Sequence, residues 1–591
     1  MIGAARGLKD CDIIMKGGIT SGVVYPKAIL RLSERYRFRS IGGTSAGAIA
    51  AAITAAAEYN RDGGGYQTIA GLPEELQNRL LTLFQPSPEL RRVFESTVLV
   101  IAGQKGASLR NIIVSKWPYL ISGLFGGLVL AIVAVWLGSY LGAFLLFLIG
   151  TVIGLAFLVC TVVYETLHDL VHLDFGFCPG PTLSYGNSPG LNDWLAEKIE
   201  VAAGRMTAGK APPEIPLTFN DIWLGKRRDG SDEKRAIDLR MMTTNLSLRR
   251  PNALPHMDAN HFFKKEEFAR LFPAWVVNHM VADAAEKAEE RKLADPNAED
   301  DPPGYYRFPV GGDLPLIVAA RMSLSFPILF SAVPLYRRDF PHEGKTGIPV
   351  MQRMLFSDGG LSSNFPVHFF DALLPNRPTF GISLEPFDKY DANRRVHLPM
   401  KAGSGIWLDC LVIESLPKFF MSLVHAAKDW QDRLQSTLPG YRERIASVYL
   451  KDEEGGLNLT MTPDQITTLT DLGERAGGLM IGAPGSTKDE QSFDFDDHRW
   501  RRYLVAFARI EQTLEQAAES WYRNTDPMRD FVEAYKPQSY HASPKQWREN
   551  VFERFDALMK EVKNWNGSSL RNENSDYIPK PQTVMRITPE H

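Results

Sequence analysis

A long stretch without any charged residue, from Pro118 to Val163, restricts this chain more than any other feature. It divides into two apolar segments, residues 118–137 and 141–163, around the short sequence Gly138-Ser139-Tyr140. As helices, segments of this length span about 30 Å, the thickness of the hydrocarbon core of a bilayer. Aromatic residues that favour membrane interfaces flank both segments: Trp117, Tyr119, Trp136, Tyr140 and Tyr164. We expect a transmembrane helical hairpin. The alternative, a buried soluble helical pair, would normally show a polar face.

Two crossings return the chain to the side from which it started, so the segments before and after the hairpin can form one lobe. The N-terminus has no apolar segment of the kind that signal peptides contain. Basic residues precede the first crossing at Lys105, Arg110 and Lys116, and basic residues are enriched on the cytoplasmic side of membranes. We therefore expect a multi-pass membrane protein with two helices and a catalytic lobe on the cytoplasmic side.

Size and composition exclude several classes of protein. A chain of 591 residues is too long for one hydrophobic core, so we expect at least two lobes. Its 66 basic and 69 acidic residues give a net charge of -3, which argues against nucleic acid as a partner. The four cysteines show neither metal-ligand spacing nor a disulfide framework, which favours a reducing compartment. We expect neither a metal nor a cofactor.

The sequence Gly42-Gly43-Thr44-Ser45-Ala46-Gly47 is the second strong constraint. The apolar alternating run Phe38–Ile41 predicts a strand before it, and an alanine-rich helix is predicted over residues 46–59. This is the strand–turn–helix context of a Gly-x-Ser-x-Gly nucleophile elbow. Gly43 and Gly47 suit it because such a turn has strained backbone angles and leaves no room for side chains. The motif alone is common in large chains, but this context favours Ser45 as a nucleophile.

A glycine-rich turn, Lys16 to Gly22, lies one strand–helix unit earlier. It follows a short apolar strand over residues 12–15 and precedes a helix predicted over residues 23–36. Its amides could cradle a phosphate, or they could supply an oxyanion hole to Ser45. A tight turn without a further role is the third interpretation. The absence of a Gly-Lys-Ser/Thr ending argues against a P-loop.

An aspartate follows a third apolar run, in Leu355-Phe356-Ser357-Asp358-Gly359-Gly360. The carboxyl ends of strands are where α/β sheets place their chemistry. Taken alone, however, this fragment is slightly better explained as an ordinary Asp-Gly turn.

The three features occur in a fixed order: a glycine-rich loop, Gly-x-Ser-x-Gly one strand–helix unit later, and a distant Asp-Gly-Gly. This ordered set resembles the patatin-like phospholipase family. Residues Ala319–Phe330 are similar to that family's Ser-x-Ser-x-Pro-x-x-Phe segment, and Asn364-x-Pro366 is similar to the segment after its aspartate. The resemblance covers about residues 12–384, interrupted by the hairpin.

The resemblance implies a three-layer α/β/α sandwich and a Ser-Asp dyad without histidine. Ser45 would be the nucleophile and Asp358 the base, and the amides of Gly17, Gly18 and Ile19 would form the oxyanion hole. Glycines of the same motifs would support these groups: Gly22, Gly43, Gly47, Gly359 and Gly360. The loop departs from the family at Ile19 and Ser21, where Gly and Lys or Arg are usual. The chemistry agrees, because a serine hydroxyl needs a base and a desolvated carboxylate can serve as one.

We divide the chain into four parts. Residues 8–95 and 176–390 form the catalytic domain, residues 96–175 an insertion with the hairpin, and residues 391–591 a mainly helical C-terminal region. The expected function is that of a membrane-associated serine acyl hydrolase cleaving phospholipid or lysophospholipid esters at the bilayer. One alternative is an α/β-hydrolase esterase with a triad of Ser45, Asp358 and either His368 or His425. The other is a catalytically silent membrane scaffold.

Overall fold

The computed structural model describes residues 8–18, 20–101, 117–225, 235–339, 350–387, 394–399, 413–414, 416–451, 453–456, 458–482, 493–535, 544–565, 570 and 577–580. Its centre is an 11-stranded sheet in the order β12-β13-β11-β1-β2-β4-β10-β9-β6-β7, with β5 paired to β4. The strands are β1 (Lys9–Met15), β2 (Tyr36–Gly43), β4 (Asp238–Asn245), β5 (Arg250–Leu254), β6 (His261–Phe263), β7 (Tyr306–Arg307), β9 (Val333–Asp339), β10 (Val350–Asp358), β11 (Thr379–Pro386), β12 (Val396–His397) and β13 (Ile445–Leu450). A separate small sheet pairs β3 (Gly176–Cys178) with β8 (Ile328–Phe330). The α/β class predicted from the sequence is confirmed.

Strand direction divides the large sheet into two parts. Strands β13, β11, β1, β2 and β4 run parallel, whereas β10 pairs with β4 in the antiparallel direction. Alternate side chains of β1 enter two different clusters, because successive residues of a strand point to opposite faces. Ile13 and Met15 belong to the main hydrophobic core, and Ile14 belongs to a smaller cluster on the other face.

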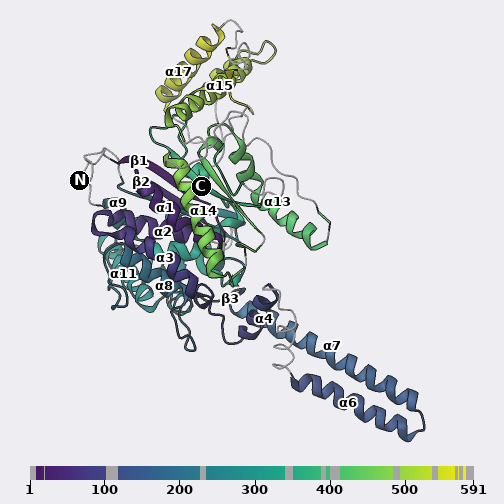
Figure 1. Ribbon diagram of the computed structural model, residues 1–591. Coiled ribbons are helices and arrows are strands. Elements are labelled where there is room, and N and C mark those ends of the chain that lie inside the picture. The colour runs from purple at the N-terminus through teal and green to yellow at the C-terminus, as the bar shows by residue number, and fades with distance from the viewer. Residues whose placement is uncertain are drawn as a thin grey trace.

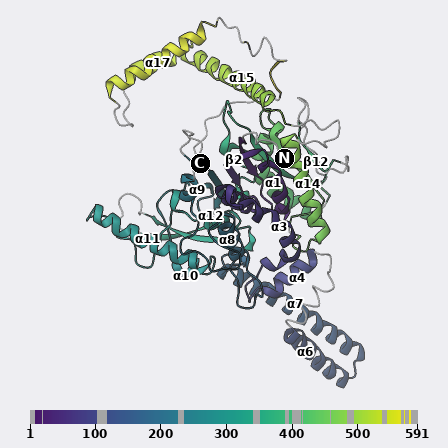
Figure 2. The same cartoon turned by 60° about the vertical axis from the view of Figure 1, so that its left-hand side comes forward.

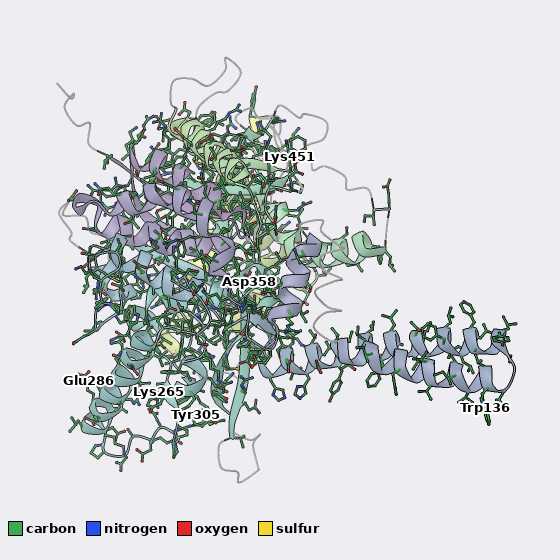
Figure 3. All side chains as sticks on the ribbon, turned by 60° about the horizontal axis from the view of Figure 1, so that its bottom comes forward. Trp136, Lys265, Glu286, Tyr305, Asp358 and Lys451 are labelled. Carbon is green, nitrogen blue, oxygen red and sulfur yellow. The ribbon has the colours of Figure 1, made fainter. Side chains whose placement is uncertain are left out.

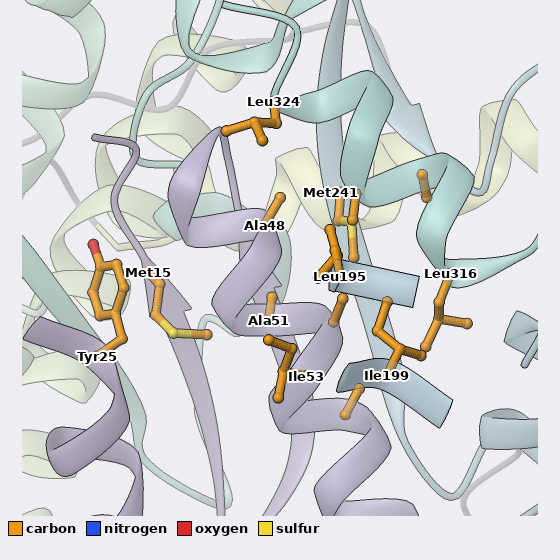
Figure 4. Packing of buried hydrophobic residues seen from close by; sticks show 14 of the residues in the cluster. Met15, Tyr25, Ala48, Ala51, Ile53, Leu195, Ile199, Met241, Leu316 and Leu324 are labelled. Carbon is orange, nitrogen blue, oxygen red and sulfur yellow. The ribbon is translucent and has the colours of Figure 1, made fainter. Parts of the chain in front are cut away.

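Helices cover the face of the main core (Figures 1 and 4). They are α1 (Tyr25–Ser33), α2 (Ala46–Tyr59), α3 (Gly65–Arg79), α8 (Leu191–Ala202), α12 (Leu316–Ser323) and α14 (Pro463–Ile481). The opposite face carries the smaller cluster, which includes Phe365, Val367, Phe369 and Tyr441. Shorter or peripheral helices complete this body: α4 (Arg91–Ile101), α9 (Phe219–Leu224), α10 (Lys265–Phe268), α11 (Ala274–Ala294) and the 3-10 turns η1 (Ser21–Val24), η2 (Arg61–Gly63), η3 (Leu81–Leu83), η4 (Gly311–Asp313), η5 (Gly359–Leu361), η6 (Val367–Phe370) and η7 (Arg442–Arg444).

The central sheet crosses the expected domain boundary at residue 390. β13 pairs in parallel with β11, from Gly381 opposite Ile445 to Pro386 opposite Leu450. α14 packs closely on η1 and α1: a Cβ added at Gly473 would lie 1.9 Å from the Val24 carbonyl oxygen, and one added at Gly477 would lie 2.8 Å from the Ala28 carbonyl oxygen. The C-terminal third therefore contributes two strands, β12 and β13, to the large sheet and one helix, α14, to its core. Its remaining helices are α13 (Leu416–Thr437), α15 (Phe495–Trp521), α16 (Met528–Ala534) and α17 (Lys545–Lys563), and α15 and α17 project from the body (Figure 2).

The apolar insertion forms two antiparallel helices, α6 (Trp117–Trp136) and α7 (Tyr140–His172). They project from the body, with Trp136 at the far end (Figure 3). The predicted helical pair and its turn are confirmed, although α7 continues beyond Val163 to His172. Among the described residues, α7 is the one helix long and apolar enough by itself to cross a membrane, whereas the apolar part of α6 that qualifies as a shorter segment is Phe125–Trp136.

Glycines bring the two helices together, but in a different register from the one that equal depth in a membrane predicts. Counting inward from Pro118 and Val163 pairs Gly127 with Gly154. In the structure a Cβ added at Gly127 would lie 3.1 Å from the Gly150 Cα and 3.1 Å from the Phe147 carbonyl oxygen. The pairing is therefore shifted by about one helical turn from the predicted one.

Candidate active site

Ser45 lies in the turn between β2 and α2, as the motif predicts. Its backbone angles are φ 54° and ψ -128°, which a residue with a side chain rarely adopts. A Cβ added at Gly43 would lie 2.2 Å from the Gly47 carbonyl oxygen, and one at Gly47 would lie 2.3 Å from the Met15 carbonyl oxygen. Only glycine fits at either position. The strand–turn–helix context of Ser45 is thus confirmed, with Ser45 itself 3% exposed.

The last residue of α12 and the two residues after it contact both Ser45 and Asp358. The Ser323 hydroxyl accepts a hydrogen bond from the Ser45 N–H at 3.2 Å. Two residues later, the Ser325 carbonyl accepts from the Asp358 N–H at 2.9 Å. The Ser-x-Ser sequence therefore links the nucleophile turn to the aspartate.

Strand register places the same two residues at a similar level of the sheet. On one side of β4, Gly43 pairs with Met241, and Ser45 follows two residues later. On the other side, Asp358 pairs with Thr243, two residues after Met241. Asp358 is the last residue of its strand, as the sequence predicts. β10 runs antiparallel to β4, so Asp358 reaches this level of the sheet from the opposite direction.

Asn364 makes a second connection between the motifs. Its carbonyl accepts hydrogen bonds from the Gly17 N–H at 2.9 Å and from the Thr44 hydroxyl at 2.8 Å. A Cβ added at Gly17 would lie 2.2 Å from the Asn364 Oδ1 and 3.1 Å from the Ser45 Cβ. A Cβ added at Gly360 would lie 2.7 Å from the same Asn364 oxygen and 2.8 Å from the Asp358 Oδ1. All three motifs therefore meet around Asn364.

Asp358 ends β10 and begins a tight turn. Its Oδ1 accepts a hydrogen bond from the Gly360 N–H at 2.7 Å, and the Thr244 hydroxyl donates to its carbonyl at 2.8 Å. A Cβ added at Gly359 would lie 2.0 Å from the Met242 carbonyl oxygen, so a side chain does not fit there. Asp358 is 3% exposed.

The glycine-rich loop is arranged differently from the expected oxyanion hole. The Gly17 N–H donates a hydrogen bond to the Asn364 carbonyl, so this amide is already hydrogen-bonded. Gly18 turns its carbonyl toward the elbow, where it accepts from the Ala46 N–H at 3.1 Å and the Ser45 hydroxyl at 3.4 Å. Gly22 packs on α2, where an added Cβ would lie 3.0 Å from the Ala46 Cβ. Ile19 lies outside the described residues.

The cation that contacts this loop is Lys16, at its start. The family resemblance predicts a cation at the other end, at the position of Ser21. The Lys16 ammonium group lies 2.6 Å from Glu385 and donates to the Ser383 hydroxyl at 3.3 Å. Burial alone would raise the pKa of Glu385, but Lys16 and Ser383 outweigh it and hold that pKa below its usual range. Ser21 lies beneath the loop, with its hydroxyl 2.2 Å from a Cβ added at Gly18.

Comparison with known proteins agrees with this geometry. The sequence profile of the family described as Patatin, patatin-like phospholipase, matches residues 201–371. A curated protein of Rhizobium meliloti (strain 1021), named RpoH suppressor, is 32% identical over 670 residues, which covers 99% of each chain. The chain belongs to the patatin-like phospholipase family.

Two solved structures are similar over most of this chain, but at low TM-scores. VipD from Legionella pneumophila is 12% identical, covers 95% of this chain and 90% of its own, and has a TM-score of 0.29. The type III effector protein ExoU is 14% identical, covers 95% of this chain and 73% of its own, and has a TM-score of 0.28.

The patatin match contains one half of the candidate site. Residues 201–371 include the Ser-x-Ser segment, Asp358 and Asn364, whereas Ser45 and the glycine-rich loop precede that range. The contacts from Ser323 and Asn364 join the two halves.

An apolar pocket of about 780 Å³, open solvent included, lies along α2 and is lined from Ala46, the residue after Ser45, onward. One face of α2 lines it with Ala46, Ile49, Ala50, Ile53 and Thr54, at the spacing of successive helical turns. Other lining residues come from the glycine-rich loop, from α3 and from the end of α12, and they include Gly22, Ile69, Leu72, Leu76 and Leu324. Figure 4 shows Leu324 near the start of α2 and Ile53 further along it.

Two buried charged residues that support the patatin motifs escaped the sequence argument. Arg321 donates to the Ser325 hydroxyl at 2.6 Å and to the Ser331 carbonyl at 2.9 Å. Burial lowers the pKa of Arg321 to about 10, although Cys178 and Asp358 act in the opposite direction. The second residue is Asp432 on α13. Burial raises the pKa of its carboxyl group, and hydrogen bonds from the Phe365 and Asn364 amides oppose that rise. Arg321 stands inside a recognised motif, but nothing in the sequence near Asp432 points to the site.

The triad alternative depends on two histidines. His368 lies in η6, with its ring centroid 5.2 Å from that of Phe369. The side chain of His425 lies outside the described residues. Among the described residues, no group of three or more His, Cys, Asp or Glu side chains could hold a metal ion.

Proposed function

We propose that this protein is a membrane-associated serine acyl hydrolase that cleaves fatty-acyl esters of phospholipids or lysophospholipids. Ser45 is the nucleophile, and Asp358 takes its proton. Membership of the patatin-like phospholipase family supports lipid acyl hydrolysis in general. The assignment of the two residues rests mainly on one observation: residues 323–325 bind the Ser45 N–H at one end and the Asp358 N–H at the other.

The chemistry requires amide donors for the tetrahedral oxyanion. We assign this role to the Gly18 amide, whose residue contacts the N-terminus of α2, where the helix dipole favours negative charge. Because the Gly18 carbonyl faces Ser45 and Ala46 in this structure, the loop must shift when an ester binds.

The pocket beside Ser45 accommodates the fatty-acyl chain in this proposal. From Ala46 to Ile53 the lining face of α2 extends about 10 Å, given the rise of 1.5 Å per residue. An acyl chain entering at Ser45 would thus run along Ile49, Ala50 and Ile53.

Ala50→Phe should shorten this pocket and shift the preference toward short acyl chains. We expect kcat/KM for a long-chain nitrophenyl ester to fall at least about tenfold, since a filled apolar pocket rejects extra methylenes by roughly that factor. Activity on the butyryl ester of the same series should change less than threefold, about the effect of 0.6 kcal/mol. The butyryl ester also serves as the folding control. An equal loss on both esters would contradict the pocket assignment.

The hairpin holds the active site at the bilayer in this proposal. Several large apolar side chains of α7 are more than half exposed: Phe144, Val152, Ile153, Phe157 and Val163. So many exposed apolar groups on one long helix favour a lipid environment over water. The basic residues Lys105, Arg110 and Lys116, which lie outside the described residues, favour a catalytic lobe on the cytoplasmic side.

Replacing residues 118–163 with a short Gly-Ser linker should give a soluble protein that still cleaves a short-chain ester. Hydrolysis of phospholipid in vesicles should fall at least about tenfold, because the tether no longer concentrates the enzyme at the surface. Full-length Ser45→Ala protein is the control, since it should bind membranes without hydrolysis. Sedimentation of the shortened protein with membranes would contradict the anchor, and digestion of the lobe by protease outside sealed cells would contradict its orientation.

A further inference from the structure

Asp432 contacts the segment that follows the Asp-Gly-Gly turn. It lies in the last turns of α13, is 7% exposed, and accepts three hydrogen bonds. The Asn364 N–H donates at 2.6 Å, the Phe365 N–H at 2.9 Å and the Ser363 hydroxyl at 3.1 Å. Three consecutive residues are therefore held by one carboxylate from a helix outside the family match.

The peptide that Asp432 holds is the one on which the other motifs converge. The Asn364 N–H is bound to Asp432, and the carbonyl of the same residue binds the Gly17 N–H and the Thr44 hydroxyl. Gly17 begins the glycine-rich loop, and Thr44 immediately precedes Ser45. Displacement of Asn364 would thus move the loop and the nucleophile turn relative to Asp358.

A carboxylate suits this set of donors, because it accepts at both oxygens from two amides and a hydroxyl. An asparagine could keep the two amide hydrogen bonds only with its NH₂ group toward the Ser363 hydroxyl. It would then replace three charge-assisted hydrogen bonds with neutral ones, which are roughly half as strong.

We propose that Asp432 is a positioning residue of the active site, which keeps the glycine-rich loop and the Ser45 turn in place relative to Asp358 by holding Asn364. This role rests on the proposed hydrolase function. In this role Asp432 makes α13, and thereby the C-terminal third of the chain, necessary for catalysis. Asp432 itself does not contact the substrate.

The test compares Asp432→Asn with a matched variant, Glu443→Gln. Glu443 is also a buried carboxylate of the C-terminal region, 2% exposed, and it accepts from the Gly440 N–H at 2.8 Å. Glu443 precedes the first residue of β13, which pairs with Gly381. Glu385 and Lys16, which lie near the site, are at the opposite end of these strands. Both variants lose a buried acceptor, but only Asp432→Asn loses one that contacts the site.

Kinetics are measured on a water-soluble butyryl ester, well below the unfolding temperature of each variant. Asp432→Asn should lower kcat about ten- to a hundredfold while KM stays within about twofold. The rate of Ser45 labelling by a fluorophosphonate should fall in parallel. Glu443→Gln should lower the unfolding temperature to a similar extent and leave kcat unchanged. If Asp432→Asn does not fold, Ser363→Ala, which removes one of the three hydrogen bonds, should still lower kcat severalfold.

Wild-type kcat in Asp432→Asn or Ser363→Ala, or an equal loss in Glu443→Gln at equal stability, would overturn the positioning role alone. Absence of Ser45-dependent hydrolysis in the wild-type protein would instead overturn the proposed function, and the positioning role with it.

Discussion

Ser45→Ala should lower ester hydrolysis at least about a thousandfold, as removal of a catalytic serine does in other hydrolases. Folding should be unaffected, because the Ser45 hydroxyl makes one long hydrogen bond, 3.4 Å to the Gly18 carbonyl. The measurement is kcat/KM on purified protein with a nitrophenyl ester, together with fluorophosphonate labelling. Retention of most of the activity would refute the assignment of the nucleophile.

Two further variants separate loss of chemistry from loss of structure. Ser33→Ala, at a serine that donates to the Leu30 carbonyl near the end of α1, should keep full labelling. Ser45→Gly should be as inactive as Ser45→Ala but more stable, by about 1 kcal/mol, since glycine adopts the positive φ of this turn without strain. A gain in stability on replacing Ser45 would show that this serine is not required for folding.

Asp358→Asn should reduce hydrolysis by a factor comparable to that of Ser45→Ala. The asparagine oxygen can still accept the Gly360 N–H, so the turn is kept, but the amide cannot take a proton from serine. If the two residues act as a unit, the double variant should be little worse than either single one. Multiplied losses in the double variant would mean that Asp358 acts independently of Ser45.

Histidine substitutions decide between the dyad and the triad in the same assay. His368→Ala and His425→Ala, alone and together, should leave at least about half of the activity, because a dyad uses no imidazole base. A loss at either position as large as that of Asp358→Asn would favour the triad.

Local sequence patterns predicted the elements that carry the site, because short-range rules govern them. Gly43, Gly47 and Gly359 occupy positions where a Cβ would overlap backbone atoms, and such positions are recognisable in a sequence. The Ser-x-Ser segment and Asn364 were identified through the family resemblance. Their contacts with Ser45 and Gly17 join residues hundreds of positions apart, and periodicity contains no information about such pairs.

The remaining differences have a common cause, which is long-range packing. The run Ile445–Leu450 has a strand pattern, but its helical surroundings concealed that it joins the sheet beside β11. The Gly17 N–H was expected to be available to an oxyanion, whereas the Asn364 carbonyl binds it. Asp432 has no local signature because its role depends on where α13 ends in space.

The order of strands in the sheet has a consequence for the time at which this protein becomes active. β1 pairs with β2, which is synthesised directly after it, and with β11, from Asp12 opposite Thr379. A ribosome adding about 5–20 residues per second reaches Asp432 roughly 20 to 80 seconds after Ser45. In that interval the growing chain contains Ser45 but lacks Asp358, then Asn364, and last Asp432. The apolar hairpin is completed early in the same interval, so in the proposed function the chain would reach its membrane anchor well before it could hydrolyse an ester.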